Sequence, residues 1–175
     1  MAEDPGDRVA RIQAEWRRER PEIDVSPQGV IGRLHRLAGA LTTELVAVYT
    51  QHGLGEGEFD VLATLRRSGA PFERAPGELA EHTMVTTGAM SKRIDRLEAA
   101  GLVTRRPADR AVDGAGGADG RRRLVALTPA GLRLIDAAFA DHMANEQRLV
   151  AELDPADRIE LERILTRWLA RHERP

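Results

Sequence analysis

The segment from Ala75 to Arg123 restricts the fold of this chain more than any other. Near its start, Pro76 suits the first turn of a short helix, where a backbone N–H has no partner within the helix. Farther along, three apolar residues recur at spacings of four and three: Met90, Ile94 and Leu97. This spacing predicts a second helix with one buried face. Gly101 should end that helix at about Ala100, because glycine readily adopts the left-handed conformation that follows many helices.

The other face of this second helix carries small, hydroxyl and cationic side chains. Thr86 or Thr87 can cap the helix by accepting a hydrogen bond from one of its first N–H groups. The residues expected to face solvent are Thr87, Gly88, Ser91, Lys92 and Arg96. Short side chains permit close approach to a DNA major groove, cations pair with phosphates, and donors reach base edges. We therefore predict that this helix, from Thr86 onward, contacts DNA.

Two basic stretches after the helix predict a β-hairpin. Residues 102–106 and 122–127 are rich in strand-forming residues, and a link rich in Gly and Asp separates them. Residues 71–74 are expected to add a short third strand. Two helices followed by a basic hairpin form a winged helix–turn–helix. The predicted fold is therefore mainly α, with a wing of two or three strands.

Positive charge is concentrated in one segment of the chain, although the chain as a whole is slightly acidic. The 175-residue chain has a net charge of −2, whereas residues 86–123 contain nine cationic and five acidic side chains, a local balance of +4. Such a local excess of positive charge is what phosphate binding requires. The chain is 42% hydrophobic but only 3% aromatic, so an aliphatic core of packed helices is expected.

Several chemistries lack the residues they need. The chain has no cysteine, which excludes disulfides, thiol catalysis and thiol-based redox sensing. Its five histidines form no metal-binding motif, and no serine sits in a nucleophile elbow. We therefore expect no catalytic residues, no cofactor and no metal site. Because no signal peptide or long apolar run is present, a cytoplasmic protein without membrane contact is expected.

Further amphipathic helices are expected on both sides of the winged segment. Their approximate ranges are 7–20, 28–52, 57–67, 129–153 and 155–172, with Thr128 and Asp154 as caps before prolines. The longest of them carries a stripe of six apolar residues: Val30, Leu34, Leu37, Leu41, Leu45 and Val48. Together, these outer helices have more apolar surface than a small winged domain can cover.

The chain resembles the MarR family of bacterial transcription factors over about residues 30–171. The resemblance is carried by T-G-A-M-S-K-R-I-D-R-L-E-A-A-G-L-V, then D-G-R, then L-T-P-A-G. It implies that the outer helices form a homodimer, in which residues 1–56 and 128–175 dimerise and residues 57–127 bind DNA. A two-fold dimer would set two recognition helices roughly 34–36 Å apart on double-stranded DNA. The expected operator is an inverted repeat.

The resemblance also assigns roles in the wing. Asp119 is expected to orient Arg121, which enters the minor groove, and Arg122 follows as a further DNA contact. Residues 108–118 form an insertion relative to the compact loop that is common in the family. The alternative is that these arginines belong to a solvated turn.

An added N-terminal helix resembles the urate-responsive PecS/HucR-like subgroup. Four residues match the set that marks it: Trp16, Asp60, Arg93 and Arg105. Arginine binds planar anions such as urate through paired N–H donors, and an indole can cover a flat ring. Asp60 would repel the anion when ionised, or hold Arg105 in place before the ligand arrives.

Each of these four residues also has a simpler interpretation. Trp16 lies on an apolar stripe and is at least a packing residue. Asp60 can be a surface carboxylate paired with an arginine, and Arg93 can contact phosphate or form an ion pair. Arg105 can line the DNA face of the wing. These alternatives stay open at the level of sequence.

The predicted function is a ligand-responsive repressor that releases DNA when an anion such as urate binds. A first alternative within the family is a repressor that responds to a phenolic or drug-like ligand. A second alternative, from another class, is a helical binding protein or small enzyme without DNA activity. Specific, salt-dependent binding to its own promoter would separate a repressor from that class.

Overall fold

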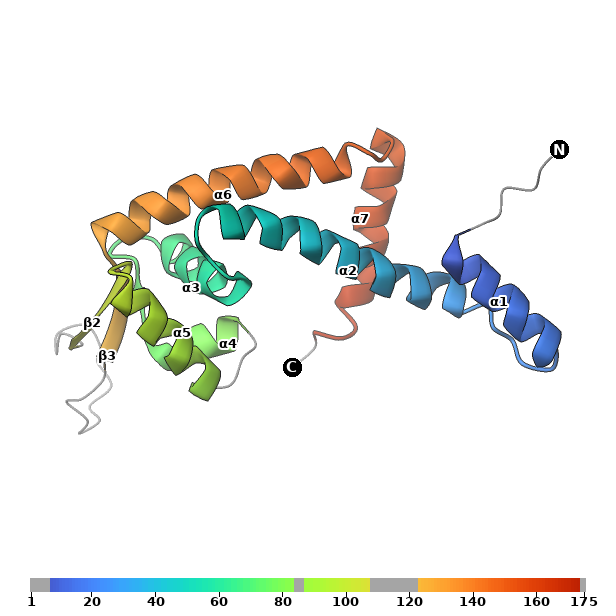
Figure 1. Ribbon diagram of the computed structural model, residues 1–175, viewed down its shortest axis with the longest axis horizontal. Coiled ribbons are helices and arrows are strands. Elements are labelled where there is room, and N and C mark those ends of the chain that lie inside the picture. The colour runs from blue at the N-terminus through green and yellow to red at the C-terminus, as the bar shows by residue number, and fades with distance from the viewer. Residues whose placement is uncertain (1–6, 84–86, 108–122, 174–175) are drawn as a thin grey trace. The chain divides into compact units, whose positions relative to one another are not determined.

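The computed structural model describes residues 7–83, 87–107 and 123–173 (Figure 1). The chain divides into two units, Met1–Leu45 and Val46–Pro175. The boundary falls inside helix α2 (Gln28–Gln51), which contributes its first turns to one unit and its last turns to the other. No helix in the described ranges is both long and apolar enough to span a bilayer.

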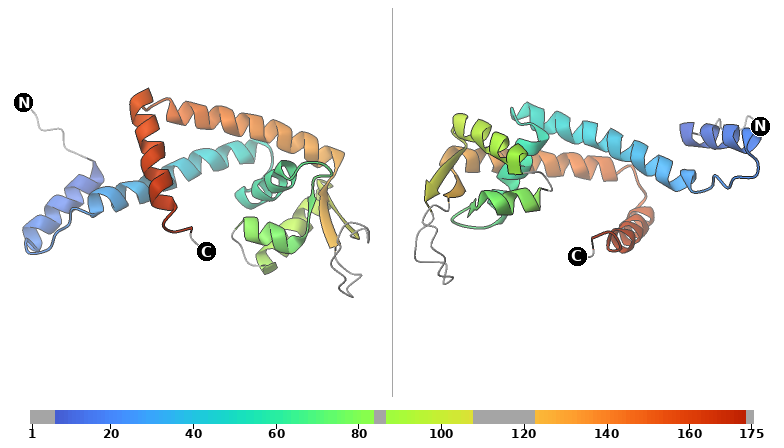
Figure 2. Two further views of the ribbon diagram at one scale, coloured as in Figure 1. Left: turned by 180° about the vertical axis from the view of Figure 1, so that it is seen from behind. Right: turned by 90° about the horizontal axis from the view of Figure 1, so that it is seen from below.

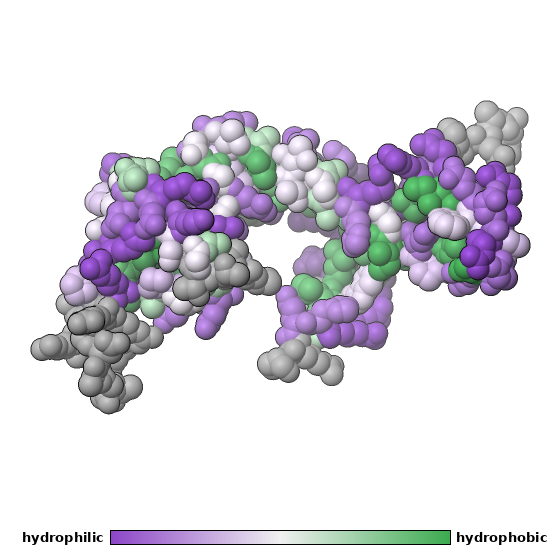
Figure 3. Space-filling model, turned by 60° about the horizontal axis from the view of Figure 1, so that its bottom comes forward, coloured by the Kyte–Doolittle hydropathy of each residue, from purple (hydrophilic) through white to green (hydrophobic). Residues whose placement is uncertain are grey.

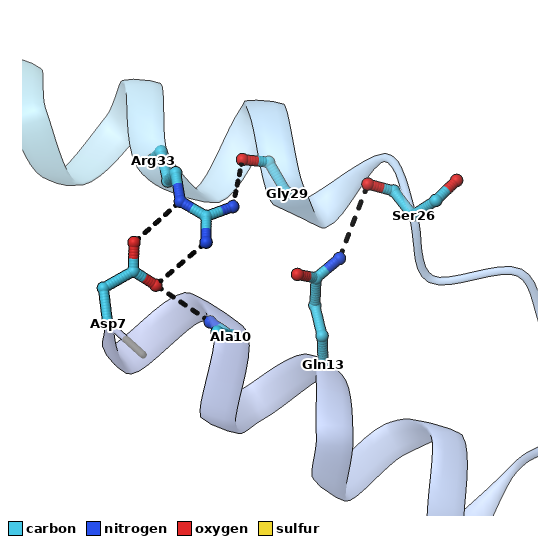
Figure 4. Close-up of polar contacts among 6 residues, drawn as sticks. All are labelled: Asp7, Ala10, Gln13, Ser26, Gly29 and Arg33. Atoms are coloured by element: carbon cyan, nitrogen blue, oxygen red, sulfur yellow. Dashed lines mark hydrogen bonds and ion pairs between the residues drawn. The ribbon is translucent and has the colours of Figure 1, made fainter. Parts of the chain in front are cut away.

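The first unit is a helical hairpin of α1 (Arg8–Glu19) and the start of α2. Asp7 caps α1 by accepting a hydrogen bond from Ala10 N at 2.9 Å, and Arg33 Nε donates to the same carboxylate at 2.7 Å (Figure 4). At the other end of the hairpin, Gln13 Nε2 donates to Val25 O at 2.9 Å. The predicted helix over residues 7–20 is therefore confirmed, and polar contacts join it to α2.

The second unit contains the predicted winged helix–turn–helix. The elements are α3 (Glu56–Arg67), β1 (Glu73–Arg74), α4 (Pro76–His82), α5 (Thr87–Ala99), β2 (Val103–Pro107), β3 (Arg123–Leu127), α6 (Pro129–Val150) and α7 (Pro155–Leu169). The three-stranded antiparallel sheet has the order β1–β3–β2, so the expected third strand is confirmed. Helices α4 and α5 lie beside the sheet (Figure 2), and α3 contacts α6.

The core of this unit surrounds α3, which contacts α4, α5, α6 and the sheet. Aliphatic side chains from all these elements fill it, as the low aromatic content predicts. The largest fully buried ones are Val61, Leu62, Leu65, Leu79, Met90, Ile94, Leu97, Val125 and Ile135. Each side chain of this size contributes about 1.5–3 kcal/mol when fully buried. Three of them form the predicted apolar face of α5.

Gly101, Thr128 and Asp154 lie at the ends of helices, at the positions that the sequence predicts. Gly101 has φ +70° and follows α5, in agreement with its expected role as a helix terminator. The Thr128 hydroxyl accepts a hydrogen bond from Gly131 N at 3.0 Å and donates to Gly101 O at 2.7 Å, so one side chain caps α6 and ties it to the end of α5. Asp154 precedes α7 as predicted, but its carboxylate makes no capping hydrogen bond.

The apolar stripe of α2 does not face a core within this chain. Of its six residues only Val48 is buried, whereas Val30 and Leu37 are exposed. Helix α7 behaves in the same way, because it has no buried residue and Ile159 on it is 69% exposed. Apolar residues accordingly reach the surface of α7 in the space-filling view (Figure 3). These helices carry apolar surface that the single chain leaves uncovered.

Because Ile94 is fully buried in the core, we expect Ile94→Ala to lower the free energy of unfolding by about 2–5 kcal/mol. Ser91→Ala, on the exposed face of the same helix, should change it by less than about 0.5 kcal/mol. Urea denaturation followed by circular dichroism measures both values. Equal effects of the two substitutions would show that the α5 face is not packed as described.

Candidate nucleic-acid interface and ligand site

The outward face of α5 is the candidate nucleic-acid interface. Its apolar residues point into the core, and this leaves Gly88, Ser91, Lys92 and Arg96 exposed, as the periodicity predicts. Thr86 lies outside the described residues, as does the side chain of Thr87, at which α5 begins. The exposed face therefore presents a residue without a side chain, a hydroxyl and two cations. Their contact with DNA stays a prediction.

One of the two cations has a partner on α3. Arg96 Nη2 and Nε lie 2.6 and 2.7 Å from Glu58 Oε1. The Arg96 side chain is 65% exposed, and ion pairs as exposed as this contribute only about 0–1 kcal/mol. A DNA phosphate can therefore compete for this guanidinium. Lys92 has no hydrogen bond or ion pair with any residue in the described ranges.

The first strand of the wing is tied to α5 by Arg105. Its backbone N–H donates to Glu98 Oε1 at 3.0 Å, and its guanidinium binds the carboxylates of both Asp95 and Glu98. The Arg105 backbone N–H, and then its guanidinium, hold the pKa of Glu98 below its ordinary value. Asp95 and Glu98, rather than Asp60, therefore hold Arg105 in place.

Arg93 leaves α5 on the side that faces α3. It packs so closely on Gly57 that a Cβ built there would lie 2.3 Å from Arg93 Cζ. Arg93 Nη1 is buried and has no hydrogen-bond partner among the described residues. A buried donor without an acceptor costs about 1–3 kcal/mol. The guanidinium is thus held in a position where an added acceptor would stabilise it.

Asp60 is the acidic group beside this arginine. Burial raises the pKa of Asp60, and the neighbouring Glu56 carboxylate raises it further, whereas the positive charges of Arg93 and Arg67 oppose the change. The ionised carboxylate is therefore less stable here than in water. The positive charge of Arg93 on α5 thus acts on the Asp60 carboxylate on α3.

A cluster of aromatic rings lies next to Asp60 in the sequence and in the core. Tyr49 stacks on Phe59 with 4.1 Å between ring centroids, and its hydroxyl lies 3.3 Å from His142 Nδ1. Burial, followed by the charges of Asp60 and Glu146, raises the pKa of Tyr49 to about 12. The hydroxyl therefore stays protonated at neutral pH, and the cluster fixes the start of α3.

The remaining expected site residues either belong to the first unit or lie outside the described residues. Trp16 belongs to the first unit, and its side chain is 46% exposed, so the packing role expected for it is only partly filled within this chain. Asp119, Arg121 and Arg122 lie outside the described residues. No group of three metal-binding side chains occurs in the part of the chain that the structure describes.

Comparisons with known proteins identify the family of this chain. The sequence profile described as MarR family matches residues 52–111. The chain is 35% identical to the HTH-type transcriptional regulator PecS of Dickeya dadantii (strain 3937) over 159 residues, which are 91% of each protein. This relative shares enough of its sequence, over enough of its length, to decide the family. The chain belongs to the MarR family of transcriptional regulators.

Solved structures agree with the fold. AbsC, a MarR family transcriptional regulator from Streptomyces coelicolor, superposes with a TM-score of 0.71 at 24% identity, covering 86% of this chain and 95% of AbsC. MepR from S. aureus, solved as a DNA complex, gives a TM-score of 0.66 at 20% identity, covering 81% and 97%. The MarR-family chain is therefore a winged helix–turn–helix transcriptional regulator and not an enzyme.

Sequence reasoning missed the acidic partners in this MarR-family protein. Glu58 faces Arg96 from another helix, and no pattern along the chain signals that pairing. Asp95 and Glu98 carried a usable signal, because a spacing of three places both carboxylates on one face of a helix. Gly57 gave no signal, since its role depends on the guanidinium that packs against it.

The raised pKa of Asp60 and the lowered pKa of Glu98 predict opposite effects on stability. Ionised Asp60 costs stability at neutral pH, so Asp60→Asn should stabilise the protein at pH 7, and this gain should vanish as the pH falls toward about 3.9. Glu98→Gln should destabilise it at pH 7, and this loss should shrink as the pH falls through the folded pKa of Glu98. Urea denaturation at several pH values measures both. Parallel pH profiles for the two variants would contradict the assignment.

Proposed function

We propose that this MarR-family protein is a homodimeric repressor that binds an inverted-repeat operator and releases it when a small anion binds. The observation that carries the proposal is the outward face of α5, which presents Gly88, Ser91 and Lys92 to solvent. In this proposal residues 1–56 and 128–175 supply the dimerisation helices, residues 1–56 also form a wall of the ligand site, and residues 57–127 bind DNA.

The proposed DNA contacts come from α5 and the wing. They are Thr86, Thr87, Gly88, Ser91, Lys92 and Arg96 for the major groove and its phosphates, and Asp119, Arg121 and Arg122 for the wing. MepR, which has the same fold, was solved as a DNA complex, and this supports DNA binding by the fold. Phosphate contacts position the helix and do not read sequence, so Lys92 and Arg96 are assigned to affinity and Ser91 to base edges.

Dimerisation is supported by the apolar surface that the single chain leaves uncovered. Helix α7 buries no residue, although it carries Ile159, Ile164, Leu165 and Leu169. Exposed apolar patches of this kind mark association surfaces in soluble proteins. A two-fold axis would repeat α5 about one DNA turn away, roughly 34–36 Å, which is why the operator is proposed as an inverted repeat.

The proposed ligand is a planar anion such as urate, with Trp16, Asp60, Arg93 and Arg105 as its binding residues. Arg93 carries this part of the proposal because its buried Nη1 lacks an acceptor. Arg105 already binds two carboxylates, so an anion must displace or share them. Trp16 is included on family resemblance alone. Anion binding would add a partner for Arg93 and disfavour ionised Asp60 beside it.

Release follows if the ligand prefers one position of α5 over another. Arg93 lies directly after Lys92 in the recognition helix, so a force on its guanidinium acts on the DNA-binding face. A differential affinity of about 1–3 kcal/mol between the two positions is enough for a measurable response.

Two alternatives to this proposal are kept. A phenolic or drug-like ligand is the second candidate, and a helical binding protein without DNA activity is the candidate from another class.

DNA binding is tested with a fluorescently labelled fragment from upstream of the protein's own gene. Lys92→Ala should weaken binding by about 1 kcal/mol per half-site and lower the slope of log K against log [salt] by about 2, because the dimer loses one phosphate contact in each half-site. Arg17→Ala removes the same charge from α1 and should leave both quantities unchanged. Absence of specific, salt-dependent binding by the wild type would favour the helical binding protein.

The ligand is tested by titrating the DNA complex with urate. Urate should release wild-type protein, and Arg93→Gln should require at least about tenfold more urate, which corresponds to about 1.4 kcal/mol. Gly57→Ala should act in the same direction, because its added methyl group displaces the Arg93 guanidinium. Arg67→Gln, which also removes a charge that acts on Asp60, is the matched control. If urate has no effect but a phenolic acid releases the DNA, the second candidate ligand replaces it.

A further inference from the structure

The first unit contains a cavity of about 340 Å³ in the groove between α1 and α2. Ligand pockets of proteins range from about 300 to 1,000 Å³, so this cavity suits a small molecule. None of the four residues proposed to bind urate lines it. The lining residues are Arg8, Val9, Ile12, Gln28, Gly32 and Arg36.

The floor of the cavity is apolar. Val9 is buried and Ile12 is half-buried on the inner face of α1. Opposite them on α2, Gly32 packs directly on Val9, since a Cβ built on Gly32 would lie 3.2 Å from Val9 Cγ1. A hydrocarbon or aromatic group in the cavity can pack on the exposed part of Ile12 beside this contact.

The rim of the cavity carries positive charge and no acid. Arg8 on α1 and Arg36 on α2 are both exposed, and neither makes a hydrogen bond or ion pair with a residue in the described ranges. Arg33, one turn before Arg36 but not part of the lining, is already occupied: it binds Asp7 and the Gly29 carbonyl (Figure 4). The two rim guanidinium groups are therefore the available partners for an anion.

The cavity also has an unsatisfied acceptor. Gln28 Oε1 is buried and has no hydrogen-bond partner among the described residues. Buried polar atoms are normally satisfied, so a rotation of the Gln28 side chain that turns this oxygen toward a ligand donor in the cavity would be favourable. The site thus combines two cationic donors, one acceptor and an apolar floor.

We propose that this cavity binds a small monocarboxylate that has an apolar body and a hydroxyl or amino donor. The carboxylate would bridge Arg8 and Arg36, the apolar body would cover Val9 and Ile12, and the donor would satisfy Gln28 Oε1. Such a ligand would add a second link between α1 and α2, which the ion pair of Asp7 and Arg33 already joins directly. The site is independent of the proposed urate response.

Three related probes test each part of this recognition on the full-length protein by isothermal titration calorimetry. 3-Phenyllactate has all three features, 3-phenylpropanoate lacks the hydroxyl, and 3-phenyllactamide lacks the charge. We expect 3-phenyllactate to bind, 3-phenylpropanoate to bind a few-fold more weakly, and the neutral amide to bind at least about tenfold more weakly. Equal affinities for acid and amide, or no binding of 3-phenyllactate at millimolar concentration, would overturn the proposal.

Variants distinguish this cavity from other sites on the protein. Arg8→Gln and Arg36→Gln should each weaken 3-phenyllactate binding by about tenfold, and Gly32→Val should abolish it by forcing α2 away from Val9 and distorting the floor. Arg17→Gln, an exposed arginine of α1 outside the lining, should have no effect. Arg93→Gln should also leave binding intact, and a loss there would show that the probe binds at the proposed urate site instead. Probe binding that none of the three lining variants changes would place the probe elsewhere on the protein and overturn the proposal.

Discussion

The packing of the apolar face of α5 onto α3 is the interaction on which the rest of the structure depends. Met90, Ile94 and Leu97 are fully buried, and their burial fixes the rotation of the helix about its own axis. That rotation alone decides which side chains reach solvent. Ser91 and Lys92 are outside because Met90 and Ile94 are inside. A transcriptional regulator of this family thus derives its exposed chemistry from its core.

Much of this arrangement could be predicted from the sequence, because it rests on local signals. The spacing of Met90, Ile94 and Leu97 gave the helix and its rotation, and Gly101 gave its end. The α2 stripe was correctly read as one apolar face of a helix, but periodicity marks such a face without showing what covers it. Partners such as Glu58 were missed because pairing between helices depends on three-dimensional packing.

For the candidate ligand residues, too, the sequence indicated the residues themselves but not their contacts in the folded chain. Asp60 and Arg93 were selected by resemblance, and the Arg93 charge lowers the pKa of Asp60 from the neighbouring helix. What no pattern indicated is that Arg93 packs on the bare backbone of Gly57 and keeps an unpaired donor. Arg105 was selected in the same way, yet its guanidinium is bound by two carboxylates of α5.

The attachment of Arg105 to α5 has a mechanical consequence. Both the main chain and the side chain of this residue bind Glu98, so the start of β2 is attached to α5. A tilt of the helix must carry the strand with it. In the proposed DNA complex, the contacts of the helix and of the wing within one half-site would then be lost together and not in sequence.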